Sequence, residues 1–109
     1  MTNLDASQIP WRKPWWPIAP KRAVEIEAEL RREVCPGHAL FGKQVAAIGY
    51  RQDQDDFLFA LDDGDYPLAR VHLTFNKESD PAFPQTDLYE SVAAWVEKGL
   101  TLDVLEFSE

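Results

Sequence analysis

The sequence predicts a single α+β domain, in which an antiparallel meander of three or four strands carries two helices packed on one face. Two stretches, residues 20–34 and 87–99, show the apolar spacing of amphipathic helices. Between them lie three segments rich in β-branched and aromatic residues, joined by short polar links. Strands that follow one another without intervening helices favour an antiparallel sheet.

The stretch at residues 57–75 predicts the centre of the sheet. Residues 57–61 are apolar on both alternating faces, which is typical of a strand covered on each side. The Asp-Gly pair at residues 63–64 favours a hairpin turn. After Pro67, which cannot donate to a ladder, the next strand separates into two rows. The apolar row is Ala69, Val71, Leu73 and Phe75, and the polar row, a candidate binding face, is Arg70, His72 and Thr74.

The first helix and the first strand of the meander precede this stretch. Residues 20–34 begin at a proline, which suits the first helical position, and end before a Cys-Pro-Gly run that stops a helix. Residues 45–50 alternate in the manner of a strand. The apolar stripe of the helix comprises Ala23, Ile26, Leu30 and Val34.

A second helix is predicted near the C-terminal end of the sequence. Thr86 or Asp87 would cap this helix, Trp95 would lie in the core, and Gly99 would end it. Residues 101–107 fit either a short terminal strand or an extended docking segment.

A Pro/Trp-rich arm, residues 1–20, precedes the domain at residues 21–109. Three of the four tryptophans lie in this arm, and its prolines favour an extended path. Tryptophans beside Arg12 and Lys13 could stack nucleobases or dock into an aromatic groove of another protein. Because exposed indoles forgo burial, we favour an arm that packs Trp15 and Trp16 on its own domain.

The charge of the chain is unevenly distributed. Residues 1–50 carry seven Lys or Arg against five Asp or Glu, whereas residues 51–109 carry four against fourteen. An acidic half repels nucleic-acid phosphates and attracts a basic protein partner. The alternative is that this charge serves solubility alone.

Composition also predicts where the protein resides. The apolar runs are too short to span a bilayer, and the N-terminal residues lack the pattern of a secretory signal. One cysteine permits no internal disulfide. We therefore expect a cytoplasmic protein that binds neither membrane nor nucleic acid.

Acidic residues cluster in two predicted turns and are candidates for partner binding. They are Asp53, Asp55, Asp56 and Asp63. Neither cluster supplies the calcium-binding loop of an EF-hand, and Asp and Gly are the residues that tight turns require. Turn formation therefore explains these clusters better than a metal site, and no cofactor is predicted.

The two histidines, His38 and His72, are candidates for a ligand or metal site. With Asp55 or Asp56 they could form a two-histidine, one-carboxylate site. The structural alternatives are a solvated loop residue for His38 and a cross-strand hydrogen bond beside Arg70 for His72. The sequence contains no Gly-rich phosphate loop, nucleophile elbow or paired-cysteine motif, so no catalytic residue is assigned.

Three segments resemble an uncharacterised family of small bacterial α+β proteins. They are the Gly-His-x-Leu-x-Gly run at residues 37–42, the Asp-Asp-x-Leu-Phe run at 55–59, and the Val-His-Leu-Thr-aromatic run at 71–75. Ala39 and Phe75 replace a proline and a tryptophan of that pattern. The resemblance covers roughly residues 27–98. It implies a compact α+β fold, gives no activity, and draws attention to His38 and His72.

Two functional classes follow. The first is a protein-binding or inhibitory module of the immunity-protein kind, whose acidic surface engages a basic partner. The alternative is a small ligand- or metal-binding domain, or an enzyme, centred on His38 and His72.

Overall fold

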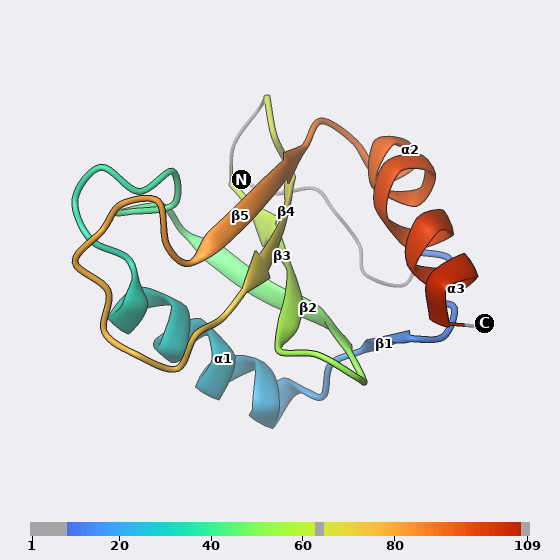
Figure 1. Cartoon of the computed structure of the whole chain (residues 1–109), viewed down its shortest axis with the longest axis horizontal. Coiled ribbons are helices and arrows are strands. Elements are labelled where there is room, and N and C mark those ends of the chain that lie inside the picture. The colour runs from blue at the N-terminus through green and yellow to red at the C-terminus, as the bar shows by residue number, and fades with distance from the viewer. Residues whose placement is uncertain (1–8, 63–64, 108–109) are drawn as a thin grey trace.

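The computed structural model describes residues 9–62 and 65–107 (Figure 1). In chain order the elements are β1 (Trp15–Pro17), α1 (Pro20–Glu33), β2 (Val45–Arg51), β3 (Asp56–Leu61), β4 (Leu68–His72), β5 (Gln85–Tyr89), α2 (Val92–Trp95), the π-helical turn η2 (Val96–Leu100) and α3 (Thr101–Phe107). In the described ranges, none of the helices combines the length and apolar character that a bilayer crossing requires.

The sheet is an antiparallel meander in the order β1-β2-β3-β4-β5. The predicted α+β class is therefore confirmed, whereas the predicted number of three or four strands is wrong, because the sheet has five. The additional strands are the two edges. β1 comes from the tryptophan arm, and β5 overlaps the start of the segment that helical spacing had assigned to a helix.

β3 is the central strand, as predicted, and all six of its residues are buried. β4 begins directly after Pro67. Its apolar row is also confirmed for Ala69, Val71 and Leu73, which are buried. Phe75 departs from this row: it lies beyond the end of β4 at a φ of 57°, and it is 41% exposed. The predicted Asp-Gly turn lies outside the described residues.

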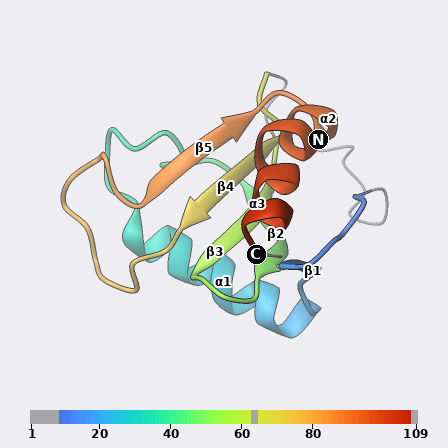
Figure 2. The ribbon, with the colours of Figure 1, turned by 45° about the vertical axis from the view of Figure 1, so that its right-hand side comes forward.

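The helical segments cover opposite faces of the sheet, so the predicted packing on one face is wrong (Figure 2). On the face covered by α1, here called the α1 face, Ile26 and Leu30 pack against β3 and β4. On the other, here called the α3 face, Trp95 and Leu100 pack with Leu58 of β3. A central strand that is apolar on both sides needs cover on both sides.

The C-terminal segment corrects three predictions, namely the helix cap at Thr86 or Asp87, the helix end at Gly99, and the strand or extended segment at residues 101–107. Residues 85–89 pair with β4, and the helix begins only at Val92, where the Ser91 hydroxyl accepts a hydrogen bond from the Ala94 N–H. The helical path then continues through Gly99 to Phe107, so residues 101–107 are neither a strand nor an extended segment. Trp95 is fully buried, as predicted.

The tryptophan arm packs on the domain. Trp15 is fully buried on the α3 face, which confirms its predicted packing, whereas Trp16 is 37% exposed and donates to the Gln52 side chain. Trp11 lies very close to Gly49. A Cβ atom on residue 49 would come within 2.3 Å of the Trp11 indole. Only glycine fits there.

Glu33 of α1 anchors the segment that follows β4. It is fully buried, and its carboxylate accepts hydrogen bonds from the backbone N–H groups of Thr74 (2.9 Å) and Phe75 (2.7 Å). Burial raises the pKa of Glu33, and its hydrogen bond with Glu29 raises it further. The backbone at the strand end is thereby satisfied by a helix residue rather than by another strand.

Candidate functional site

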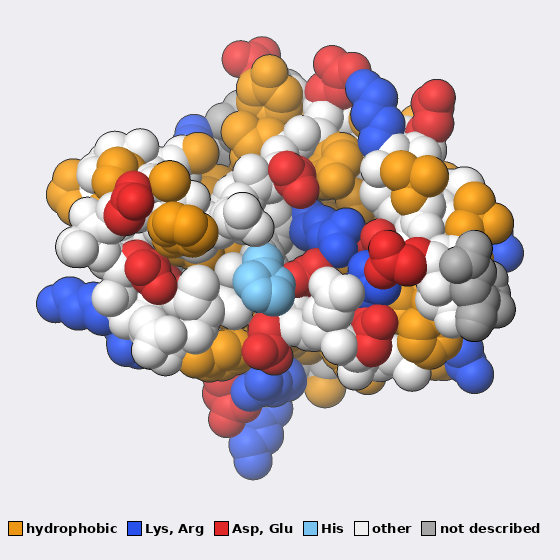
Figure 3. All heavy atoms as spheres, viewed as in Figure 1, with side chains coloured by type: hydrophobic (Ala, Val, Ile, Leu, Met, Phe, Trp, Pro, Cys, Tyr) orange, Lys and Arg blue, Asp and Glu red, His pale blue; other side chains and the backbone are white. Residues whose placement is uncertain are grey.

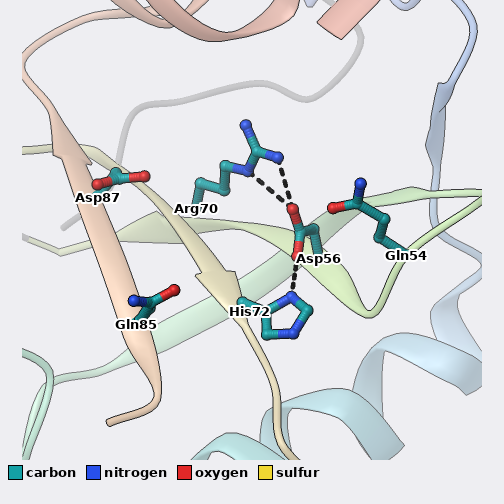
Figure 4. A pocket seen from close by; sticks show the side chains of 6 residues that line it. All are labelled: Gln54, Asp56, Arg70, His72, Gln85 and Asp87. Carbon is teal, nitrogen blue, oxygen red and sulfur yellow. Dashed lines mark hydrogen bonds and ion pairs between the residues drawn. The ribbon is translucent and has the colours of Figure 1, made fainter. Parts of the chain in front are cut away.

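A solvent-open hollow of about 450 Å³ lies on the α3 face (Figure 4). It is lined by Gln54, Asp56, Arg70, His72, Gln85 and Asp87. Strand register explains why five of these meet. His72 pairs with Asp56 on β3 and with Gln85 on β5, and Arg70 pairs with Asp87. Directly paired residues of antiparallel strands share a face, so their side chains converge.

Asp56 forms the floor of the hollow. Its side chain is only 4% exposed. One carboxylate oxygen accepts from Arg70 Nε (3.0 Å) and Nη2 (2.5 Å), and the other is 2.5 Å from His72 Nδ1. A carboxylate only accepts, so Nδ1 carries the hydrogen in this contact and Nε2 is the second site of the ring. The His72 side chain is 52% exposed, which leaves Nε2 accessible from solvent.

An ion-pair network extends from this floor along the sheet. Arg70 Nη1 lies 2.9 Å from an oxygen of Asp103, whose other oxygen lies 3.1 Å from Arg51 Nη1. Arg51 also pairs with Asp53 at 2.7 Å and with Glu106 at 2.9 Å. α3 therefore supplies two carboxylates to two arginines on β2 and β4. The guanidinium groups of Arg51 and Arg70 are largely buried, and buried charges need such partners.

Trp15 of β1 contacts two members of this network. Its indole Nε1 donates to Asp103 at 2.8 Å, and the guanidinium of Arg70 lies 5.5 Å from its ring centroid. Trp15 also packs edge-to-face against Trp95, with ring centroids 5.5 Å apart. The arm thus covers part of the face that bears Arg70, as predicted.

The charge balance of this region is acidic. Burial alone would lower the pKa of Arg70, but its hydrogen bonds to Asp56 and the charge of Asp103 raise it, so Arg70 stays charged. The network nevertheless holds four carboxylates against two guanidiniums. Figure 3 views this side, with acidic side chains on several sides of a histidine near its centre.

Asp87 adds a further carboxylate to the hollow. Its side chain points from β5 toward the hollow (Figure 4), and no hydrogen bond or ion pair joins it to another described residue. Burial raises the pKa of the neighbouring Tyr89, and the charge of Asp87 raises it further. Asp87 is therefore a negative group that the described part of the chain leaves without a counter-ion.

The two histidines are not brought together. His38 is 6% exposed, its Nδ1 accepts from the Leu40 N–H, and its Nε2 lies 2.9 Å from the Pro84 carbonyl. His38 contacts Thr86, which pairs with Val71 of β4. Val71 lies on the α1 face, whereas His72 lies on the α3 face. The predicted solvated position of His38 is wrong. Across the described ranges, no cluster of three His, Cys, Asp or Glu is arranged to hold a metal ion.

The polar row of β4 is only partly as predicted. Arg70 and His72 meet in the hollow, but Thr74 lies beyond the end of the strand. The Thr74 hydroxyl instead lies within hydrogen-bond distance of the carboxylates of Glu33 (3.1 Å) and Glu78 (2.8 Å). Strand alternation stops applying where β4 ends at His72, and this is why Thr74 leaves the row.

The acidic candidates have different environments. Asp53 is bound by Arg51, Asp55 is exposed, and Asp56 is buried under Arg70 and His72, so Asp56 is not a surface acid. Asp63 lies outside the described residues. Sequence reasoning missed Asp87 and Asp103 as site residues, together with Arg51. The alternation of polar and less polar side chains over residues 85–89 was the available signal for a strand that places Asp87 in the hollow.

A scan against protein-family models found no match, and searches of curated proteins and of solved structures found none either. What the site does must therefore follow from its own chemistry. The hollow offers one unpaired carboxylate, two amide side chains and an oriented imidazole. These groups can bind a cation or a hydrogen-bond donor, and the imidazole can accept a proton.

Proposed function

We propose that this protein is a protein-binding module for a basic partner, and that a lysine or arginine side chain of the partner enters the hollow. The observation that supports this most is the carboxylate of Asp87, which has no counter-ion among the described residues. The nearest cation, Arg70, is already held by Asp56 and Asp103. An incoming cation would therefore meet uncompensated negative charge.

The rest of the hollow suits the same occupant. The amide oxygens of Gln54 and Gln85 can accept the remaining hydrogen bonds of an ammonium or guanidinium group. Asp55, exposed in the adjacent β2–β3 link, extends the acidic surface outward. An inhibitory module of the immunity kind would use such a surface to steer a basic toxin and then hold it.

Association with the partner is expected to slow as salt rises, because exposed charges act over a Debye length of about 10 Å at ~0.1 M salt. Asp87→Asn should weaken binding by about fivefold, mainly through the association rate, since an exposed ion pair contributes on the order of 1 kcal/mol. The measurement is surface plasmon resonance with the basic protein that the tagged chain retains at low salt.

The matched control is Glu25→Gln, which makes the same charge change on α1, on the opposite face of the sheet. It should leave the association rate within about twofold of the original. If no basic protein is retained, or if both variants behave alike, the acidic surface serves solubility and the proposal is wrong.

A second candidate is a small ligand- or metal-binding domain, or an enzyme, that uses His72. The observation that favours it is the contact of His72 Nδ1 with the buried Asp56, which orients the ring and leaves Nε2 open to solvent. An imidazole held in this way can serve as a general base or as a single metal ligand. His38 would take no part, because its two ring nitrogens have partners elsewhere.

His72→Ala should cost less than about 1 kcal/mol of unfolding free energy, because the side chain is half exposed. In this second candidate the same variant abolishes any binding of Zn²⁺ detected by isothermal titration calorimetry. His72→Gln serves as the control, since it keeps a polar side chain without the imidazole. Equal Zn²⁺ responses in all three proteins would exclude His72 as a ligand, and a stability loss above ~3 kcal/mol would show a structural role.

A further inference from the structure

The sheet has two edges, and they differ in whether they can accept another strand (Figures 1 and 2). β1 is three residues long, and Pro14 and Pro17 remove N–H groups from it and from its flank. β5 has five residues and contains no proline. An edge without prolines presents a row of unpaired backbone groups to which another chain can hydrogen-bond.

The register shows which backbone groups of β5 point outward. Leu61 N donates to Pro67 O at 2.8 Å, and Leu73 N donates to Asp55 O at 2.9 Å. In an antiparallel ladder, hydrogen-bonded and non-bonded pairs alternate. Ala69 and Val71 therefore bond toward β3, whereas Leu68, Arg70 and His72 bond toward β5. On β5 the partners of those residues, Gln85, Asp87 and Tyr89, bond inward, so the N–H and C=O groups of Thr86 and Leu88 point outward.

We propose that an extended basic segment of the partner adds to β5 as a sixth strand. This inference rests on the proposed function and specifies how the partner is held. Gln85, Asp87 and Tyr89 present their side chains on the hollow side of the edge, while Thr86 and the 37% exposed Leu88 lie on the opposite side. The segment that fits alternates cationic side chains, placed beside Asp87, with apolar ones, placed beside Leu88.

A second copy of this chain fits the edge less well. Two β5 strands paired antiparallel with full overlap would place Asp87 opposite Asp87. The backbone of Asp87 bonds toward β4, so this would be a non-hydrogen-bonded pair, in which the side chains are closest. Like charges directly opposite each other destabilise such a pair, and the chain carries a net charge of −8. The charge thus favours a cationic strand over self-association.

The probe is the peptide acetyl-Lys-Val-Lys-Val-Lys-Val-Lys-amide, titrated into the full chain and followed by fluorescence anisotropy. An acidic peptide with Glu in place of Lys, and a peptide of equal charge with Pro in place of each Val, are the controls. We expect binding of the first peptide and at least about tenfold weaker binding of both controls, because one lacks the charge and the other cannot form the ladder. Equal binding of the proline-containing peptide would overturn strand addition.

Leu88→Pro tests the outward backbone directly. It removes the Leu88 N–H without removing a hydrogen bond between β4 and β5, and proline is tolerated at such edge positions. Peptide binding should weaken about tenfold, whereas Leu88→Ala, which keeps the N–H, should change it less than about threefold. Hydrogen exchange on the unaltered chain provides a second measurement: saturating peptide should slow the Leu88 amide at least about tenfold and leave the Asp87 amide unchanged.

The outcomes separate the two proposals. Binding that falls with salt and with Asp87→Asn, but not with Leu88→Pro, overturns strand addition and leaves a basic partner in place. Binding that falls with Leu88→Pro, but not with salt or Asp87→Asn, supports strand addition and contradicts the role of charge. No protection of the Leu88 amide at saturating peptide overturns the inference, as does a stable dimer of the free chain that Leu88→Pro dissociates.

Discussion

Replacing Asp103 with alanine is expected to lower the free energy of unfolding by about 3 kcal/mol or more. Asp103 is 7% exposed, it accepts from Trp15 Nε1 and Arg70, and it forms an ion pair with Arg51. Its removal leaves an indole N–H without its acceptor and two arginines without a shared counter-ion. Breaking a buried pair by removing one partner costs more than forming it contributed, because the remaining charge stays poorly solvated.

The control for this variant is Glu106→Ala, on the same helix and against the same arginine. The Glu106 side chain is 67% exposed, so its loss should cost less than about 1 kcal/mol. Urea denaturation followed by circular dichroism gives both values. Equal effects of the two substitutions would show that the network does not stabilise the fold through burial.

Trp15→Ala is expected to destabilise the protein by about 3–5 kcal/mol, as deletion of a buried aromatic side chain generally does. Trp15 is fully buried between Trp95 and Arg70, and it is the first residue of β1. The loss corresponds to a melting temperature lower by more than about 10 °C for a domain of this size. Differential scanning calorimetry measures it.

Trp16→Ala is the matched comparison, because the neighbouring indole is 37% exposed and bonds only the Gln52 side chain in the described structure. It should cost less than about 1 kcal/mol. Trp15→Phe, combined with Asp103→Ala in a double-mutant cycle, isolates the indole hydrogen bond, and a coupling energy of about 1 kcal/mol is expected. Similar melting temperatures for Trp15→Ala and Trp16→Ala would mean that the arm does not hold the sheet and the terminal helix together.

The same network limits what the hollow can bind. Arg70 lies in the hollow, but Asp56, Asp103 and the Trp15 ring all hold it in place. It is therefore poorly available as an anion-binding residue, although an arginine in a polar hollow would ordinarily suggest one. The neighbouring Asp87 has no partner in the described chain, which is why we propose a cation as the occupant.

Part of the candidate site followed from strand alternation alone. Arg70 and His72 are two residues apart on one strand, so they share a face wherever that strand lies. Their partners could not be predicted in this way. The position of Asp87 in the hollow depends on the pairing of β5 with β4. Asp103 lies in α3, whose outward residues include Leu102 and Leu105, each 59% exposed. A helix that turns an aspartate inward and leucines outward inverts the pattern from which helices are predicted.

The sequence by itself determined those elements whose pattern of apolar residues lies within one continuous stretch of the chain. α1 has its apolar stripe, β3 is apolar on both sides, and β4 has its alternating rows. Only the tertiary structure decided the two edge strands, the placement of helices on opposite faces, and the separation of His38 from His72. These features depend on contacts between residues far apart in the chain, such as Trp15 with Asp103, and local spacing does not encode such contacts.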